Sequence, residues 1–183
     1  MDTMSTHNND QKAGEGFGYR FRTAVVTLSD SSAAGGREDM SGPLIGEILE
    51  EAGGYEIISY DLLPDDLDRL TALLIKLADE GGADLILTTG GTGFSPRDFT
   101  PEATMAAATR NAPGISEYMR MKSAEITPKA MLSRGVSVIR NQTLIINLPG
   151  SPKAVRENLS VILPALSHGL EILLGRTGDC AVK

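Results

Sequence analysis

The densest group of residues suited to chemistry is the run TTGGTGFSPRDFTPEAT, from Thr88 to Thr104. Thr92 lies among three glycines, so the backbone can approach a ligand closely and direct its N–H groups at an anion. The run matches neither the G-x-G-x-x-G fingerprint nor a loop ending in G-K-[ST]. It can equally be a tight strand-to-helix turn, with Arg97 and Asp98 forming a surface ion pair worth under about 1 kcal/mol.

A second candidate anion site is NLPGSP, from Asn147 to Pro152, where an apolar run gives way to a helical pattern. Free N–H groups and the helix dipole favour an anion at such a helix start. Ser151 is also a good N-cap, with Pro152 at the first helical position. The two roles are compatible because caps and anion sites share the same geometry.

The third candidate is the acidic pair in LPDD, Asp65 and Asp66, at the end of an apolar run. One carboxylate is expected to cap the helix that follows. The other could hold Mg²⁺, which binds proteins through one or two carboxylates and completes its shell with substrate phosphates. His7 and His168 cannot form a zinc site by themselves, because one precedes the folded region and the other lies among helical leucines.

Apolar and polar patterns predict the elements that position these residues. Three runs are apolar throughout, as in strands buried on both faces, and they alternate with helical patterns. We therefore expect an α/β fold with three α/β/α layers and a mostly parallel sheet, with chemistry in the loops after strand ends. The predicted strands are 22–28, 55–63, 84–89, 136–140 and 143–147, the last two forming a hairpin. The predicted helices begin near residues 43, 66, 100, 114, 128 and 152, the last kinked at Pro164.

Length and composition narrow the class of protein. A chain of 183 residues with 41% hydrophobic and 22% charged residues predicts one folded domain, residues 21–175, with a leader at 1–20 and a tail at 176–183. The net charge of −7 and the low aromatic content argue against nucleic-acid binding, and no apolar run is long enough to span a membrane. The single cysteine, Cys180, cannot form an internal disulfide, so we expect a cytoplasmic protein.

Four motifs in order, TTGGTGFSPRDFTPEAT, LPDD, ITPKAMLSR and TLIINLPGSPKAV, resemble the molybdopterin-binding Mog/MoaB family. The resemblance covers about residues 23–174 and is strongest to the MogA-type branch of molybdopterin adenylyltransferases. It implies a homotrimer that transfers AMP from ATP to molybdopterin with Mg²⁺, giving adenylyl-molybdopterin and pyrophosphate. A separate molybdate-inserting enzyme would then use the product.

The resemblance also implies roles for individual residues. Asp65 would hold Mg²⁺ and Asp98 would orient the pterin, although the division of catalytic work between these two carboxylates stays open. Ser29 and Asp39 would contact the nucleotide. The residues expected to cradle the pterin phosphate are Gly91, Thr92, Gly93, Ser123, Ser133, Asn147, Pro149, Gly150 and Ser151.

Because both reactants are anions and the chain carries −7, the reaction needs local neutralisation of charge. Arg97, Lys129 and Arg134 are the candidate cations. Two alternatives differ in class: a non-catalytic molybdopterin carrier or scaffold of the MoaB type, and a generic nucleotide-binding α/β domain unrelated to molybdenum. The carrier predicts pterin binding without turnover, and it would be favoured if Asp65 faced away from the pocket.

Overall fold

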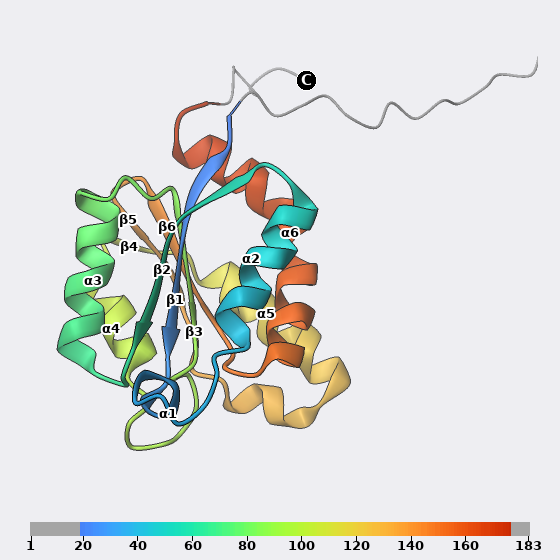
Figure 1. Cartoon of the computed structure of the whole chain (residues 1–183). Coiled ribbons are helices and arrows are strands. Elements are labelled where there is room, and N and C mark those ends of the chain that lie inside the picture. Colours follow the sequence, from blue (N-terminus) through green and yellow to red (C-terminus); the bar gives the residue numbers. More distant parts are fainter. Residues whose placement is uncertain (1–18, 177–183) are drawn as a thin grey trace, which may run out of the picture.

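The computed structural model describes residues 19–176, which form one central sheet with helices on both faces (Figure 1). Within these residues the strand order is β2-β1-β3-β6-β5-β4. Neighbours among β2, β1, β3 and β6 pair in parallel, whereas β5 is antiparallel to both β6 and β4. The strands are β1 (Phe21–Leu28), β2 (Tyr55–Leu63), β3 (Leu85–Thr89), β4 (Arg110–Asn111), β5 (Ser137–Arg140) and β6 (Thr143–Leu148). The predicted mostly parallel sheet is confirmed.

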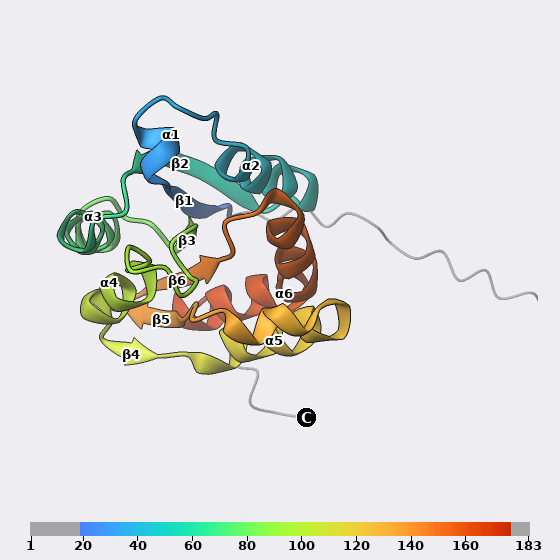
Figure 2. The same cartoon turned by 90° about the horizontal axis from the view of Figure 1, so that it is seen from below.

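The helices divide between the two faces of the sheet (Figures 1 and 2). They are α1 (Asp30–Ala33), α2 (Ser41–Ala52), α3 (Leu67–Asp79), α4 (Thr100–Ala107), α5 (Pro113–Ile126) and α6 (Pro152–Leu173), with a 3₁₀ helix, η1, at Pro128–Leu132. One hydrophobic cluster joins the sheet to α2, α5 and α6, and a second joins its other face to α3 and α4. The predicted three layers are therefore confirmed.

Two elements depart from the sequence prediction. The loop expected after the first strand contains α1, whose first turn is capped by the Ser29 hydroxyl accepting a hydrogen bond from the N–H of Ser32 at 3.2 Å. The two-residue strand β4 was not predicted, because it is exposed and exists only through its pairing with β5. The last helix is continuous through Pro164.

Tyr19 and Arg176, which fall in the predicted leader and tail, contact each other at the ends of the described chain. Tyr19 donates a hydrogen bond from its hydroxyl to Asp84 at 2.7 Å, and the guanidinium of Arg176 lies 3.4 Å from the centroid of the Tyr19 ring. Residues 1–18 of the predicted leader and 177–183 of the predicted tail, with His7 and Cys180, lie outside the described residues. Between residues 19 and 176, no helix has the length and apolar character needed to cross a membrane.

The parallel strands end at the same edge of the sheet, near α1 in Figure 1. Beyond this edge lie the segments singled out by sequence: Ser29 after β1, Asp65 after β2, the loop 90–93 after β3 and the turn 149–151 after β6. Close packing at this edge requires glycine, since a Cβ on Gly90 (φ +97°) would lie 2.1 Å from the carbonyl oxygen of Leu28.

Candidate active site

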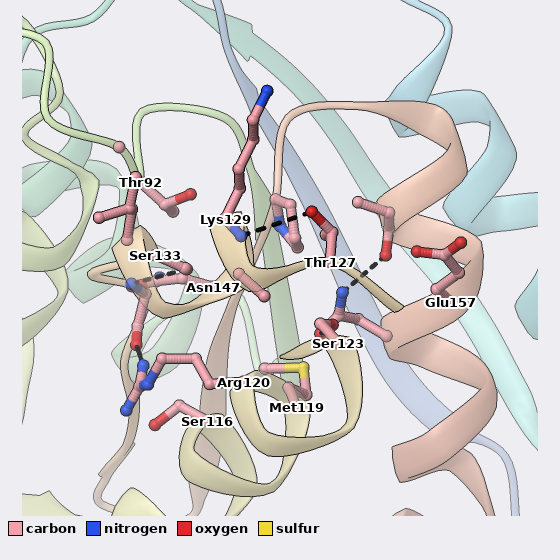
Figure 3. Close-up of a pocket in the computed structure, with 17 residues that line it drawn as sticks. Thr92, Ser116, Met119, Arg120, Ser123, Thr127, Lys129, Ser133, Asn147 and Glu157 are labelled. Carbon is pink, nitrogen blue, oxygen red and sulfur yellow. Dashed lines mark hydrogen bonds between the residues drawn. The ribbon is translucent and has the colours of Figure 1, made fainter. Parts of the chain in front are cut away.

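A cavity of about 300 Å³ opens between α5, η1, the start of α6 and the strand-end loops (Figure 3). Its wall is mostly apolar and carries some polar side chains from each of these elements, as is usual for a small-molecule site. Six residues predicted for the pterin site line it: Thr92, Gly93, Ser123, Ser133, Asn147 and Pro149. Four further polar residues line the cavity and were not predicted from the sequence: Ser116, Arg120, Glu157 and Asn158. They lie on α5 and α6, where helical spacing alone does not distinguish a cavity residue from a surface residue.

The glycine loop, residues 90–93, is held in one conformation by its neighbours. Thr100 donates a hydrogen bond from its hydroxyl to the carbonyl of Gly90 at 2.9 Å, and the N–H of Arg134 donates to the carbonyl of Thr92, also at 2.9 Å. Gly91 has φ +62°, and a Cβ there would lie 2.3 Å from the Thr100 hydroxyl. The loop is therefore a rigid turn, and it also delivers Thr92 to the cavity wall.

Asn147 contributes to the cavity chiefly by holding it together. Its side-chain amide donates to the hydroxyls of Thr88 and Thr104, each at 2.9 Å, and its oxygen accepts the N–H of Val136 at 3.1 Å. The residue is 2% exposed. Its polar atoms are thus already paired with protein groups, and it joins β6, β3 and α4 beneath the cavity.

The turn after β6 begins α6 as predicted, with the Ser151 hydroxyl accepting the N–H of Ala154 at 3.3 Å. Gly150 packs on the glycine loop, because a Cβ there would lie 3.2 Å from the Cα of Gly90. Its carbonyl accepts a hydrogen bond from the Ser41 hydroxyl at 2.8 Å. Ser151 lines neither this cavity nor a second, smaller one nearby, whereas Gly150 lines the smaller one.

The second cavity, of about 90 Å³, lies on the other side of the Gly90–Gly150 contact. The two predicted nucleotide contacts, Ser29 and Asp39, both line it. The carboxylate of Asp39 accepts the N–H groups of Ser41 and Gly42 at 2.9 and 3.2 Å, and it also accepts the hydroxyl of Tyr60.

Burial tends to raise the pKa of Asp39, but the hydrogen bonds from Tyr60 and the start of α2 outweigh it, so the pKa lies below its ordinary value. Burial and the adjacent Asp39 raise the pKa of Tyr60 to about 12, which keeps its hydroxyl protonated as a donor. Asp39 therefore organises the 30–42 segment that walls this cavity.

Asp65 and Asp30 hold each other in place across the ends of β1 and β2. The N–H of Asp65 donates to the Asp30 carboxylate at 3.0 Å, and the N–H of Asp30 donates to the Asp65 carboxylate at 3.2 Å. Arg97 donates to both carboxylate oxygens of Asp30 and to the carbonyl of Asp65. The helix cap is Asp66, which accepts the N–H of Arg69 at 2.9 Å, so Asp65 remains available for another role.

The two predicted catalytic carboxylates flank the glycine loop. One oxygen of Asp65 lies 3.1 Å from where a Cβ of Gly91 would stand, and Asp98 lies 2.9 Å from the equivalent point on Gly93. The carboxylate of Asp98 also accepts the N–H of Ser95 at 2.9 Å. Neither aspartate is among the residues that line the two cavities, so both lie beside the glycine loop rather than in a cavity wall.

The charges around Asp65 suit a divalent cation. Burial raises the pKa of Asp65, and the carboxylates of Asp30 and Asp98 add to the effect, whereas the hydrogen bond from Arg97 lowers the pKa of Asp30. No three His, Cys, Asp or Glu side chains within residues 19–176 are arranged to hold a metal. A single hard carboxylate oxygen fits Mg²⁺ that takes its other ligands from phosphate and water, so the residues present fit that ion.

The candidate cations are in different situations. Arg97 is paired with Asp30, and Arg134 is paired with Glu102 and with backbone carbonyls. Lys129 lines the larger cavity. Of the three predicted cations, only Lys129 thus lines the larger cavity, while the guanidinium groups of Arg97 and Arg134 bind protein oxygens.

The geometry defines an α/β protein with a cavity, lined in part by polar side chains, where its parallel strands end. A model of the family described as "probable molybdopterin binding domain" matches residues 24–168, and the chain belongs to this family. The resemblance seen in the motifs is confirmed.

Named relatives agree over most of the chain. The molybdopterin adenylyltransferase of Helicobacter pylori J99 is 43% identical over 152 residues, 82% of this chain and 86% of that protein. The enzyme of the same name from Escherichia coli K12 is 42% identical over 155 residues, 81% of this chain and 79% of that protein. The crystal structure of the molybdopterin biosynthesis enzyme MoaB from Thermus thermophilus superposes with a TM-score of 0.80 at 46% identity, covering 85% of this chain and 97% of that one.

Proposed function

We propose that the protein is a molybdopterin adenylyltransferase, which transfers AMP from ATP to molybdopterin. The observation that carries this proposal is the position of the glycine loop between the two cavities. Thr92 and Gly93 line the larger cavity and Gly90 the smaller one, while Asp65 lies against Gly91 and Asp98 against Gly93. Because the two cavities share the glycine loop, molybdopterin in one and ATP in the other would lie next to each other. Curated relatives at 42–44% identity that carry this name support the assignment.

In this mechanism an oxygen of the pterin phosphate attacks the α-phosphorus of ATP, the bond from that phosphorus to the bridging oxygen breaks, and pyrophosphate leaves. The larger cavity would hold the pterin, with its phosphate at the Thr92 hydroxyl and the N–H groups of the glycine loop. The smaller cavity would hold phosphates of the nucleotide beside Ser29. Such a rigid loop lowers the barrier mainly by holding the two reacting groups in contact.

Asp65 would hold Mg²⁺, which when bound neutralises charge on the triphosphate. Asp98, fixed by the N–H of Ser95, would orient the pterin side next to Gly93. These roles rest on the position of each carboxylate at one end of the loop. The hydrogen bonds to Asp30 and Ser95 keep both carboxylates oriented without substrate.

The carrier alternative would be favoured if Asp65 faced away from the pocket. The Asp65 carboxylate instead lies against Gly91, in the loop that contributes to both cavities, and this arrangement favours the enzyme. A protein that only holds molybdopterin has no need of a second cavity across the loop or of an aspartate kept free of the helix cap.

Three further features belong to the proposal. A homotrimer is supported by the family resemblance and by an apolar cavity of about 260 Å³ between α5 and α6, where the exposed Tyr118 offers a contact surface. Delivery of the product to a molybdate-inserting enzyme follows from the reaction itself, because adenylyl-molybdopterin still lacks its metal. A cytoplasmic location is supported by the single cysteine of the chain.

The test is pyrophosphate release in a coupled assay with molybdopterin, ATP and Mg²⁺. We expect release only when all three are present, and loss of release when EDTA is added. Absence of release with authentic molybdopterin, while the protein still binds the pterin, would overturn the enzyme in favour of the carrier.

A further inference from the structure

Arg134 makes contacts that differ from those of a cation waiting for a phosphate. It lies between η1 and β5, in the segment that also supplies Ser133 and Gly135 to the larger cavity. Its Nε donates to the carbonyl of Gly93 at 2.7 Å, and one Nη donates to the carbonyl of Asp98. The other Nη pairs with Glu102 in the first turn of α4. Each of the three guanidinium nitrogens thus has a different partner.

These partners enclose the segment that carries the site. Gly93 and Asp98 are its two ends, and the N–H of Asp98 donates to the carbonyl of Ser95 within it. The backbone N–H of Arg134 adds a bond to the carbonyl of Thr92 at 2.9 Å. A single residue therefore fixes the pterin end of the glycine loop, the backbone of Asp98 and the η1–β5 wall of the cavity relative to one another. Arg134 makes none of these contacts with residues of the smaller cavity.

We propose that Arg134 is a positioning residue for the pterin half of the site, acting through Gly93 and Asp98. This inference rests on the proposed function for its effect on turnover. A planar guanidinium with donors in a fixed fork suits this role, whereas the single ammonium of lysine cannot reach three separated acceptors at once. The consequence is selective: loss of Arg134 disturbs the pterin site and Asp98, and it leaves the nucleotide site unchanged.

The chain offers a matched control in Arg140. Its Nε and one Nη bind the carboxylate of Asp79, and its other Nη donates to the carbonyl of Ala107 at 2.9 Å. This residue therefore makes the same kinds of bond to one carboxylate and to backbone. It lies on β5 at the end that turns into β6, and its partners line neither cavity. Arg134→Gln and Arg140→Gln remove comparable bonds, only one set of which touches the site.

The experiment compares wild type, Arg134→Gln, Arg134→Lys and Arg140→Gln by molybdopterin titration followed by fluorescence, and by steady-state kinetics with each substrate varied. Thermal unfolding records any general loss of stability. We expect Arg134→Gln to weaken molybdopterin binding about 10-fold and lower kcat about 10-fold or more, with the KM for MgATP within twofold of wild type. Arg134→Lys is expected to recover little, and Arg140→Gln to match wild type in affinity and in both KM values.

Equal behaviour of the Arg134 and Arg140 variants would overturn the proposal, as would a rise in the KM for MgATP as large as the loss of pterin affinity. If Arg134→Gln fails to fold, Glu102→Gln, which removes only the charge on the far side of the guanidinium, is expected to show the same selective pattern at reduced size. The binding arm is independent of turnover, so a failure of the adenylyltransferase assignment would be seen as a wild type that binds molybdopterin and makes no product.

Discussion

Replacing Asp65 by Asn removes one negative charge and keeps the shape of the side chain. The amide oxygen can still accept the N–H of Asp30, which the carboxylate accepts at 3.2 Å, so the reciprocal contact between these two residues is retained. Asp65 is not the cap of α3, because that role belongs to Asp66. The substitution therefore tests the charge of Asp65 and little else.

The size of the effect follows from the surroundings of the carboxylate. Two unit charges about 4 Å apart interact by about 4 kcal/mol at an effective dielectric constant of 20. Part of this attraction between Asp65 and a cation is equal in the substrate complex and in the transition state, and only the part that is stronger in the transition state lowers the barrier. We expect kcat to fall about 100-fold, which corresponds to about 2.7 kcal/mol, with molybdopterin affinity within twofold of wild type.

Asp65→Asn is expected to lower activity but not the free energy of unfolding. Burial and the nearby Asp30 and Asp98 carboxylates raise the pKa of Asp65 in the folded protein above its unfolded value. The folded state therefore holds this proton more tightly, so ionised Asp65 opposes folding at neutral pH, and the penalty disappears as the pH falls below the unfolded pKa. We expect the variant to be at least as stable as wild type at pH 7, with the difference shrinking on acidification.

The assay is pyrophosphate release over a range of Mg²⁺ concentrations, together with urea unfolding at pH 7 and pH 4. Asp66→Ala is the matched control: loss of the cap should cost about 1 kcal/mol of stability and leave turnover unchanged. Retention of more than half the activity by Asp65→Asn would refute its role in holding the cation. A large loss of stability would show that Asp65 is instead a structural residue.

Further predictions concern the two cavities and the assembly. Thr92→Ala should weaken molybdopterin binding about 5- to 10-fold, by about 1–1.4 kcal/mol, with unchanged melting temperature; equal affinity would make the glycine loop only a turn. Asn147→Ala should lower the free energy of unfolding by about 1–3 kcal/mol in urea, because it leaves buried hydroxyls unpaired. Tyr60→Phe should raise the KM for MgATP several-fold while the KM for molybdopterin stays constant. Sedimentation should give a homotrimer at micromolar concentration, and a mass near 19.4 kDa throughout would contradict it.

Local patterns were sufficient to predict most of the framework. The apolar runs that became β1, β3 and β6 are buried on both faces of the sheet, and such strands are recognisable without knowledge of their partners. The cap at Ser151 is similarly local, since it depends on residues three apart. Strand β4 could not be found this way, because its two residues are exposed and are defined only by pairing with β5.

The parts of the site that sequence reasoning missed all depend on contacts between distant segments. Asp65 and Asp66 are equivalent in the local sequence, so either could cap α3. The structure shows that Asp65 exchanges hydrogen bonds with Asp30, 35 residues earlier, and that Asp66 is the cap. Arg134 looks like a free cation in the sequence, whereas its partners Gly93 and Asp98 lie about 40 residues away in the chain. Asn147 lines the larger cavity as predicted, but its hydrogen bonds depend on distant segments: the bond to Thr88 follows from the parallel register of β3 and β6, and the bond to Thr104 from the packing of α4.

Mass spectrometry of the pterin after incubation with ATP and Mg²⁺ tests most directly whether this chain joins AMP to molybdopterin. We expect molybdopterin to gain the mass of one adenylyl group, in amounts equal to the pyrophosphate released, and Asp65→Asn to form this product about 100-fold more slowly. Recovery of unmodified molybdopterin from a folded protein that binds it tightly would contradict adenylyl transfer and identify the chain as a pterin carrier.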